Sequence, residues 1–433
     1  MKLFGSKKLL TAVDRRVTAW GMDCLFNHAP FASQPAYTPI AKSLLYVPAS
    51  ALPYHITGYT TRTHAVIRAL QDADAGVQVL TRPGYPWDRS DRIALPEEDR
   101  TVVDGVVYTH APWPTNNRHL FSYMMSASKV IADVAKSRSV AAIHAASNHV
   151  NALPALLAAK RLGIPFYYEM RGLWELTRAS RMPWFENSSG YHFGLSLEGL
   201  VARQADRLFV ISAALGAYVH EHWGIPPERM ALLPNCVDPA EILAADPALV
   251  EPNTIGYAGS LIGYEGLDTL LEATALLVQR GADAQLRIAG EGEARNDLGV
   301  LSHRLGLGQR VQFLGRLEPA GAREMIARCS VVCIPRKPFE VCRIVPPIKL
   351  VEAMALGKPV VVPDLPVFRD ELGSEPAGWF FRAGDAADLA QVLEDALAQP
   401  RQLAVLGCRA RDYAVTQRNW QRYVTPIVDA LPA

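Results

Sequence analysis

The chain has 433 residues, of which 49% are hydrophobic and 20% are charged, and its formal net charge is +1. This length exceeds that of one ordinary hydrophobic core, so two domains are expected. The 44 basic and 43 acidic residues nearly balance. The balance excludes long-range electrostatic attraction to nucleic acid, and any anion-binding site must be local.

The lack of a recognisable targeting signal and the spacing of the cysteines predict a cytoplasmic protein. No apolar stretch reaches the roughly 18 residues of a transmembrane span, and no signal-peptide pattern opens the chain. The six cysteines are irregularly spaced, mostly inside apolar runs, as expected of reduced core thiols. Cys329 and Cys333 are not expected to bind zinc, because no second Cys/His pair completes four ligands. No metal site is predicted.

Residues 1–40 are predicted to form a basic amphipathic extension. Its basic residues are Lys2, Lys7, Lys8, Arg15 and Arg16, and its apolar residues Leu10, Val13, Val17, Trp20 and Cys24 recur at three- and four-residue steps. Such a helix either makes peripheral contact with a membrane surface through residues 1–25 or packs on the protein's own N-terminal domain.

Residues 41–240 alternate short apolar runs with helical patterns, which predicts an α/β domain with a doubly wound sheet. The predicted strands are 44–47, 77–80, 140–144, 166–168 and 208–211, and the helices are 63–70, 151–162, 195–205 and 212–222. The proline-bearing segments 234–239 and 246–252 indicate a linker.

Residues 241–415 repeat this alternation and predict a second domain of the same class. Its predicted strands are 254–259, 285–289, 311–314, 331–335 and 359–363, and its helices are 267–280, 319–328 and 348–356. We expect two doubly wound domains facing across a cleft. Residues 416–433 are long enough for a helix that could cross back to the first domain.

The segment 329–364 carries the strongest chemical signal. Two buried strands flank a helix that starts after Pro346 and Pro347 and ends at Gly357. Ligands of such sheets bind beyond the carboxyl ends of strands, so we expect Arg336, Lys337, Arg343 and Lys349 to converge on an anion near this helix start.

Glu352 lies one helical turn after Lys349, on the same face. A carboxylate there suits the two hydroxyls of a ribose, so the pair predicts a nucleoside diphosphate site. The alternative is a solvated helix with one exposed ion pair.

Nearly the whole chain after residue 40 resembles the family 4 retaining glycosyltransferases of the GT-B fold, which has two Rossmann-like domains. The resemblance lies in PYHITGYTTRTHAVIRAL (53–70), residues 142–175, ADRLFVISAAL (205–215), LPNCVD (233–238), GYAGSLIGYEGLDTLLEA (256–273), RIAGEGE (287–293), VQFLGRL (311–317), KLVEAMALGKPVVVPD (349–364) and GWFFRAGDAADLA (378–390).

The resemblance implies transfer of a sugar from a nucleotide-diphosphate sugar to a glycan, lipid-linked or other hydroxyl acceptor with retained anomeric configuration. It implies no cofactor beyond this co-substrate and no metal. The residues expected to bind the donor are Gly58, Gly259, Ser260, Gly290, Glu291, Gly292, Arg316, Arg343 and Glu352. The expected catalytic residues are Arg336, Lys337, Lys349, Arg171 and His144, with His64 helping to position the acceptor.

No residue is a convincing nucleophile, so front-side attack is expected, with the departing diphosphate oxygen taking the acceptor's proton. Arg336, Lys337 and Lys349 would stabilise the leaving charge. Arg171 and Glu169 follow a predicted strand and either meet an anion or form a structural ion pair.

Several positions depart from the family pattern. Ile344 stands where a first motif glutamate, a ligand of the sugar hydroxyls, is expected, and Ser260 and Glu265 replace basic residues of the diphosphate loop. Ala146 interrupts a His-x-His pair, so His144 is either an acceptor-site group or a buried core histidine. A nucleotide-sugar-binding protein with a degenerate site, or a nucleotide-sugar epimerase, is the alternative function.

Two short motifs are set aside. Asp72-Ala73-Asp74 imitates a metal-binding Asp-x-Asp, but it ends a predicted helix instead of following a strand. Gly290-Glu291-Gly292 imitates half of a dinucleotide fingerprint, but Arg295 occupies the place of the third glycine.

Overall fold

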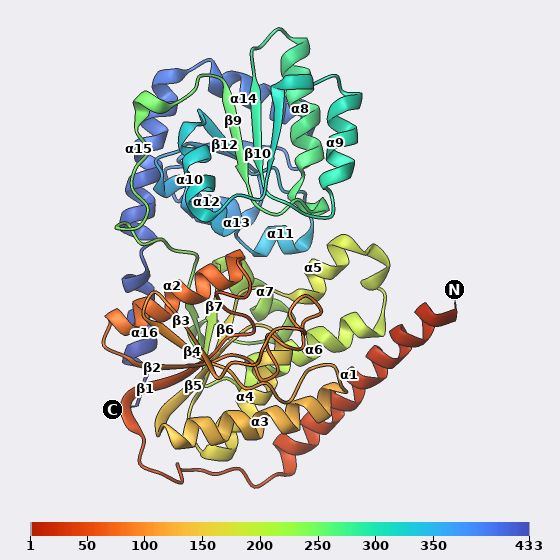
Figure 1. Cartoon of the computed structure of the whole chain (residues 1–433), viewed down its shortest axis with the longest axis vertical. Helices are drawn as coiled ribbons and strands as arrows, with labels where there is room; N and C mark the ends of the chain where they lie inside the picture. Colours follow the sequence, from red (N-terminus) through yellow and green to blue (C-terminus); the bar gives the residue numbers. More distant parts are fainter. Residues whose placement is uncertain (1, 433) are drawn as a thin grey trace. The chain divides into compact units, whose positions relative to one another are not determined.

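The structure is a computed structural model that describes the backbone of residues 2–432 and the side chains of residues 13–26 and 28–432. The chain divides into two compact units (Figure 1). The N-terminal unit contains residues 1–234 and 420–433, and the C-terminal unit contains residues 235–419. The last helix, α16 (Trp420–Asp429), therefore belongs to the N-terminal unit, where it packs against α2 (Gly58–Asp72).

The N-terminal unit is built on an eight-stranded sheet in the order β3-β4-β2-β1-β5-β6-β7-β8. Its neighbouring strands are parallel except for the antiparallel hairpin β3-β4 at one edge. The strands are β1 (Ile40–Val47), β2 (Gly76–Leu80), β3 (Arg100–Val103), β4 (Val106–Thr109), β5 (Val140–Ala146), β6 (Phe166–Met170), β7 (Arg207–Val210) and β8 (Met230–Leu232). The winding direction reverses between β1 and β5, so ligands are expected beyond the carboxyl ends of these strands.

Helices cover this sheet and connect its strands. Besides α2 and α16 they are α1 (Lys2–His28), α3 (Leu120–Ser137), α4 (His149–Leu162), α5 (Trp174–Arg181), α6 (Ser189–Gln204) and α7 (Ala213–Trp223). Strands β5 and β6 are buried along their whole length, as in a parallel sheet covered on both faces.

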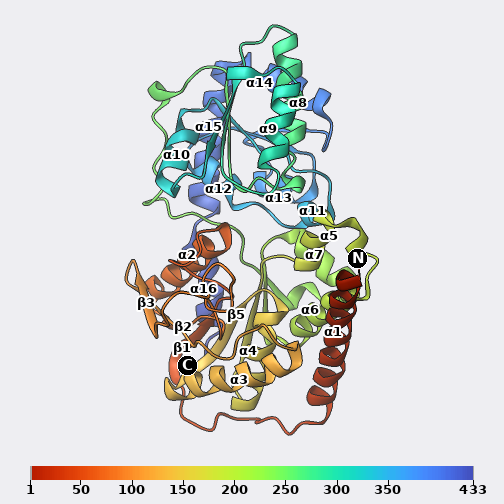
Figure 2. The same ribbon diagram turned by 45° about the vertical axis from the view of Figure 1, so that its right-hand side comes forward.

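Helix α1 lies along α6 and α3 (Figure 2). Its packed face carries Arg15, Thr18 and Met22, all buried. The predicted apolar stripe points elsewhere: Val13, Val17 and Trp20 are 50%, 49% and 71% exposed. The helix therefore packs on its own domain, but through a face other than the apolar one. Leu10 and the basic residues Lys2, Lys7 and Lys8, which belong to the same prediction, lie outside the described side chains.

The C-terminal unit has a six-stranded parallel sheet in the order β11-β10-β9-β12-β13-β14. The strands are β9 (Thr254–Ala258), β10 (Gln285–Ala289), β11 (Val311–Gly315), β12 (Val331–Cys333), β13 (Val360–Pro363) and β14 (Gly378–Phe381). The helices are α8 (Leu267–Gln279), α9 (Arg295–Arg304), α10 (Pro319–Arg328), α11 (Glu340–Ile344), α12 (Ile348–Ala355), α13 (Pro366–Leu372), α14 (Ala386–Leu397) and α15 (Pro400–Gln417). This is the doubly wound order, with its switch point between β9 and β12.

The element predicted around residue 348 is confirmed. Helix α12 follows Pro347, which serves as its N-cap, and Gly357 has φ +75° two residues after the helix ends. Only glycine adopts this left-handed conformation without steric cost, so the chain can turn directly into β13.

None of the helices in the described residues is both long enough and apolar enough to cross a membrane. All six cysteines are free thiols, and four of them, Cys236, Cys329, Cys333 and Cys342, are buried.

Candidate active site

A cluster of opposite charges forms at the switch point of the C-terminal unit. Glu265 comes from the loop after β9, Arg336 from the loop after β12, and Lys349 from the first turn of α12. The Glu265 carboxylate accepts from Arg336 Nη2 at 2.8 Å and from Lys349 Nζ at 2.8 Å. The Tyr257 hydroxyl, at the end of β9, is 2.7 Å from the same Nζ. One buried carboxylate therefore holds two of the predicted anion-binding cations in fixed positions.

The charge states of this cluster follow from burial and pairing. Burial opposes ionisation of Glu265, but Arg336 and Lys349 outweigh it and lower the pKa of Glu265 to about 2. Burial lowers the pKa of Lys349, and Glu265 acts in the opposite direction. The cluster carries two cations against one carboxylate, so it has one positive charge in excess, as an anion site requires.

Glycines bring the neighbouring loops close to these cations. Gly259 has φ +154°, and a Cβ there would lie 2.6 Å from Lys349 Nζ. A Cβ on Gly290 would collide with the carbonyl oxygen of Gly259. The loops after β9 and β10 thus meet backbone to backbone beside Lys349, and a side chain at either glycine would prevent this approach.

Glu352 lies on α12, one turn after Lys349, and is half-buried. Burial raises its pKa, while Arg323 and Lys349 oppose the shift.

The other two predicted anion-binding cations lie outside this cluster. Lys337 follows Arg336 but pairs with Asp268 of α8 at 2.5 Å. Arg343 is exposed on α11.

The remaining predicted donor residues occupy loop positions at the carboxyl ends of strands. Ser260 follows β9, Arg316 follows β11, and both are exposed. Glu291 and Gly292 are also exposed, in the loop after β10. Since β9, β10 and β11 are adjacent strands, these loops line one edge of the sheet.

A second charged network lies inside the N-terminal unit, where Glu169 of β6 is 1% exposed. Its carboxylate accepts from Arg171 Nε at 2.9 Å and from Arg62 Nη2 at 2.8 Å. Tyr46 donates its hydroxyl to Glu169 at 2.6 Å. Burial opposes ionisation of Glu169, but Arg171 and Arg62 more than offset it and hold its pKa well below the usual range.

Arg171 is fully engaged by the protein. Besides Glu169, its guanidinium donates to Thr63 Oγ1 at 2.7 Å, to the Tyr59 carbonyl at 3.1 Å and to the Tyr46 hydroxyl at 2.6 Å. Arg171 is 7% exposed. This placement corresponds to the structural ion pair that the sequence left open, and an anion could reach the guanidinium only by displacing one of these partners.

The two predicted histidines are buried at different places. His144 has no exposed surface and stacks between Tyr46 and Phe209, with ring centroids 4.7 and 5.8 Å away. Burial lowers its pKa, while Glu169, whose Oε2 lies 3.4 Å from Nε2, acts in the opposite direction; His144 is a core histidine. His64 contacts the Tyr108 hydroxyl at 2.8 Å through Nδ1. Gly58, by contrast, is exposed at the first residue of α2.

Two family models match the chain, one to each half. Residues 57–236 match the model described as "Glycosyl transferase 4-like domain", and residues 241–413 match "Glycosyl transferases group 1". The chain belongs to the family 4 glycosyltransferases. Phosphatidyl-myo-inositol mannosyltransferase of Mycobacterium leprae is 33% identical over 166 residues, which cover 37% of this chain and 42% of that protein. The alignment thus spans less than half of the length of this curated relative.

Comparison with solved structures shows that this chain has the GT-B fold. Sucrose-phosphate synthase from Thermosynechococcus elongatus superposes with a TM-score of 0.74 at 16% identity, covering 89% of this chain and 97% of that one. HepE of Anabaena, solved in complex with UDP-glucose, superposes with a TM-score of 0.65 at 17% identity, covering 90% and 100%. Both domains of the fold expected from the sequence are therefore confirmed.

Four side chains of these networks were not identified from the sequence: Tyr46, Arg62, Thr63 and Tyr257. Arg62 could have been found, because it lies at a four-residue step from Val66, on the buried face of α2. A charged residue at a core position requires a buried partner. The two tyrosines gave no such signal, since tyrosine is ordinary in a buried strand.

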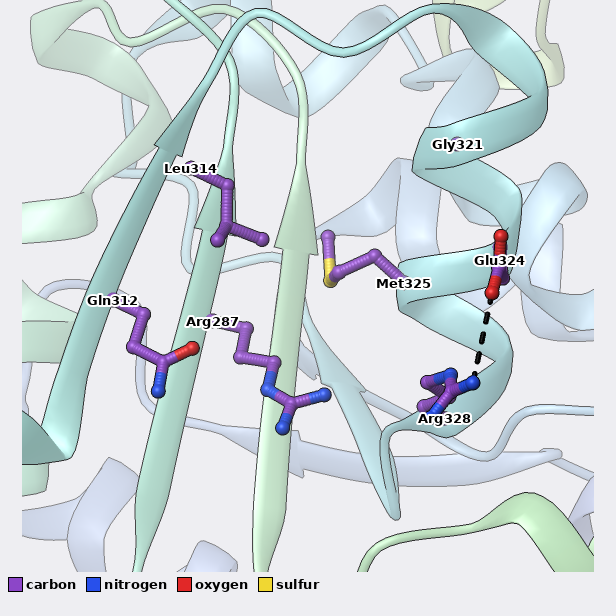
Figure 3. A pocket seen from close by; sticks show the side chains of 7 residues that line it. All are labelled: Arg287, Gln312, Leu314, Gly321, Glu324, Met325 and Arg328. Carbon is purple, nitrogen blue, oxygen red and sulfur yellow. Dashed lines mark ion pairs between the residues drawn. The ribbon is translucent and has the colours of Figure 1, made fainter.

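A pocket of about 230 Å³ lies away from the charged cluster, on the sheet of the C-terminal unit (Figure 3). It is lined by Arg287, Gln312, Leu314, Gly321, Glu324, Met325 and Arg328. Arg328 pairs with Glu324 at 3.6 Å across one turn of α10. The pocket lies between α10 and strands β10 and β11, beside the sheet rather than beyond its carboxyl ends, so we assign it no part in donor binding.

Proposed function

We propose that this protein transfers a sugar from a nucleotide-diphosphate sugar to a hydroxyl acceptor with retention of anomeric configuration. The observation that carries the proposal is the pairing of Arg336 and Lys349 through Glu265 at the switch point between β9 and β12. Two fixed cations beside closely packed glycine loops suit a diphosphate, and Glu352 on the same helix suits a ribose. The names of similar proteins agree with this class of reaction. The structural neighbour HepE was solved with UDP-glucose, and the mycobacterial sequence relative is a mannosyltransferase.

In the proposed reaction, Arg336 and Lys349 stabilise the negative charge that develops on the diphosphate as the glycosidic bond breaks. The acceptor hydroxyl attacks from the face that the diphosphate leaves, and a diphosphate oxygen takes its proton. Glu352 holds the donor during this exchange. These two side-chain cations supply the charge stabilisation that a metal ion would otherwise provide, so the proposed reaction is metal-independent.

Titration with UDP, GDP and ADP in the absence of divalent metal tests donor binding. A ligand that binds only the folded state raises the melting temperature, and 100-fold excess over Kd adds about 2.7 kcal/mol of stability. We expect one nucleotide to stabilise the wild type and to lose this effect in Glu352→Ala. The exposed Glu272 on α8 provides the control, and Glu272→Ala should respond like the wild type. No shift with any nucleotide would contradict the proposal.

We further infer that the protein contacts a membrane through the exposed stripe of α1, which would bring it to a lipid-linked acceptor. Val13, Val17 and Trp20 follow one another at helical spacing and are all about half exposed or more. Within residues 1–28 four basic residues besides the buried Arg15 stand against two acidic ones, and this excess favours an anionic lipid surface.

Vesicle co-sedimentation checks this contact. Wild-type protein should bind vesicles that contain anionic lipid and should bind neutral vesicles less. Trp20→Asp should weaken the binding severalfold, because a carboxylate would enter the apolar layer. Val107 of β4 is also about half exposed, so Val107→Asp is a matched control and should bind like the wild type. Equal binding by the two variants would exclude the α1 stripe as the contact.

A further inference from the structure

A buried cluster of His149, Glu175 and Glu198 lies in the N-terminal unit, outside the networks described above. His149 is the first residue of α4, Glu175 lies in the first turn of α5, and Glu198 is on α6. Their exposed fractions are 0%, 1% and 0%. One potential ligand atom of each residue lies within 4.8 Å of the other two.

Glu198 fixes the orientation of the His149 ring. Its Oε1 accepts from the backbone N–H of His149 at 2.7 Å and lies 3.1 Å from Nδ1. Its Oε2 accepts from the Tyr168 hydroxyl at 2.6 Å. With the Nδ1 proton directed at Glu198, Nε2 of a neutral imidazole presents a lone pair, and Nε2 has no hydrogen-bond partner among the described residues.

Glu175 contributes a second buried atom without a partner. Its Oε1 pairs with Arg15 of α1 at 3.1 Å, while Oε2 makes no hydrogen bond within the described part of the chain. A side chain at Gly194 would collide with both Arg15 and Glu175. The glycine on α6 therefore makes room for this charged pair in the core.

The charges of the cluster do not balance. Two buried carboxylates face one buried guanidinium, and the exposed Arg178 of α5 adds a second, more solvent-screened attraction to Glu175. The buried negative charge is thus only partly compensated when His149 is neutral, and a cation bound there would lower its energetic cost. An imidazole nitrogen and carboxylate oxygens are zinc ligands, and a histidine whose other nitrogen donates to a carboxylate is the usual arrangement around such a metal.

We propose that His149 Nε2 and Glu175 Oε2 bind a divalent cation of the Zn²⁺ type, while Glu198 holds the His149 ring in the orientation that this binding needs. The site would tie α4, α5 and α6 together and, through Arg15, would anchor α1 to the domain. It takes no part in the proposed transfer reaction and does not depend on it. The competing explanation, a proton on His149 that balances the charge, predicts no metal binding.

The test begins with the full-length wild-type protein. After expression with added Zn²⁺ and desalting, elemental analysis should find about one zinc per chain, because the His149 ring and the Glu175 carboxylate are already held in place. Removal of the metal with a chelator should lower the melting temperature, and Zn²⁺ but not Mg²⁺ should restore it. Co²⁺ in place of zinc should give a visible absorption spectrum typical of nitrogen and oxygen ligation.

Variants then locate the site. Glu175→Gln and His149→Asn should lose the bound metal and the response to Zn²⁺. Glu371 is a matched control, since it is also buried and pairs with Arg418 at 3.3 Å in the other unit; Glu371→Gln should keep the metal. A cooperative urea unfolding transition like that of the wild type would show that each variant is folded. The proposal is overturned if the wild type neither retains zinc nor responds to it, or if Glu175→Gln binds zinc like the wild type.

Discussion

Replacing Lys349 with alanine should lower kcat for sugar transfer by about 10²–10³-fold, the usual effect of removing one preorganised group that stabilises developing charge. Its ammonium is held 2.8 Å from Glu265 and 2.7 Å from the Tyr257 hydroxyl. This fixed position means that the charge needs little reorganisation when the diphosphate leaves. Lys349→Arg keeps the charge at a changed position and should lose less.

Steady-state kinetics with the nucleotide sugar whose nucleotide stabilises the protein would measure this effect. Because the interaction strengthens in the transition state, the loss should fall on kcat and kcat/KM and not on KM alone. Arg310 provides the control. It precedes β11 at the opposite end of the same sheet and pairs with Asp283 at 2.7 Å, so Arg310→Ala should leave kcat unchanged. A rise in KM with full kcat would contradict the proposed role.

The architecture was predictable because strands and helices alternate with the periods that define them. The five strands predicted from the pattern of the C-terminal unit are all present, and the edge strand β14 lies in residues 378–390, where the family resemblance implied a strand and a helix. The hairpin β3-β4 was missed, although Asp104-Gly105 marks its turn. Both residues have positive φ, 45° and 80°, which is the Asp-Gly signature of a two-residue hairpin loop. Its flanking strands have only four residues each, too short to stand out by periodicity.

The candidate site was predictable only in part, for a physical reason. Lys349 and Glu352 share a helix, so their proximity follows from local spacing. The link between Glu265 and Arg336 joins loops that follow two different strands, and only the sheet order brings these loops together. The buried cluster of His149, Glu175 and Glu198 likewise comes from three separate helices. Such tertiary pairings leave no periodic signal in a single sequence.

Replacing Glu265 with glutamine should destabilise the protein by about 3–5 kcal/mol, the usual cost of removing one member of a buried ion pair. Glu265 is 3% exposed and is the carboxylate that both Arg336 and Lys349 contact. Without its charge the two cations face each other across a buried space. Urea unfolding of the wild type and the variant at neutral pH would measure the difference.

The same difference should shrink in acid. The pKa of Glu265 in the folded state is about 2, below its ordinary value of 4.5. A depressed pKa means that the ionised carboxylate stabilises the folded state fully above about pH 4.5, and that this contribution is lost as the pH falls toward about 2. Glutamine cannot titrate, so the wild type should approach the variant in stability across this interval. A constant difference between them would show that the carboxylate's charge is not what stabilises the cluster.

A nucleoside diphosphate should partly restore the stability of Glu265→Gln, because the diphosphate supplies the negative charge that the variant lacks. The stabilising nucleotide should therefore raise the melting temperature of this variant by more than it raises that of the wild type. Glu371→Gln removes a buried carboxylate from another ion pair of the same unit, with Arg418, and should gain no more than the wild type. If both variants respond equally, Arg336 and Lys349 do not face the diphosphate, and the charge that drives the proposed transfer must come from elsewhere.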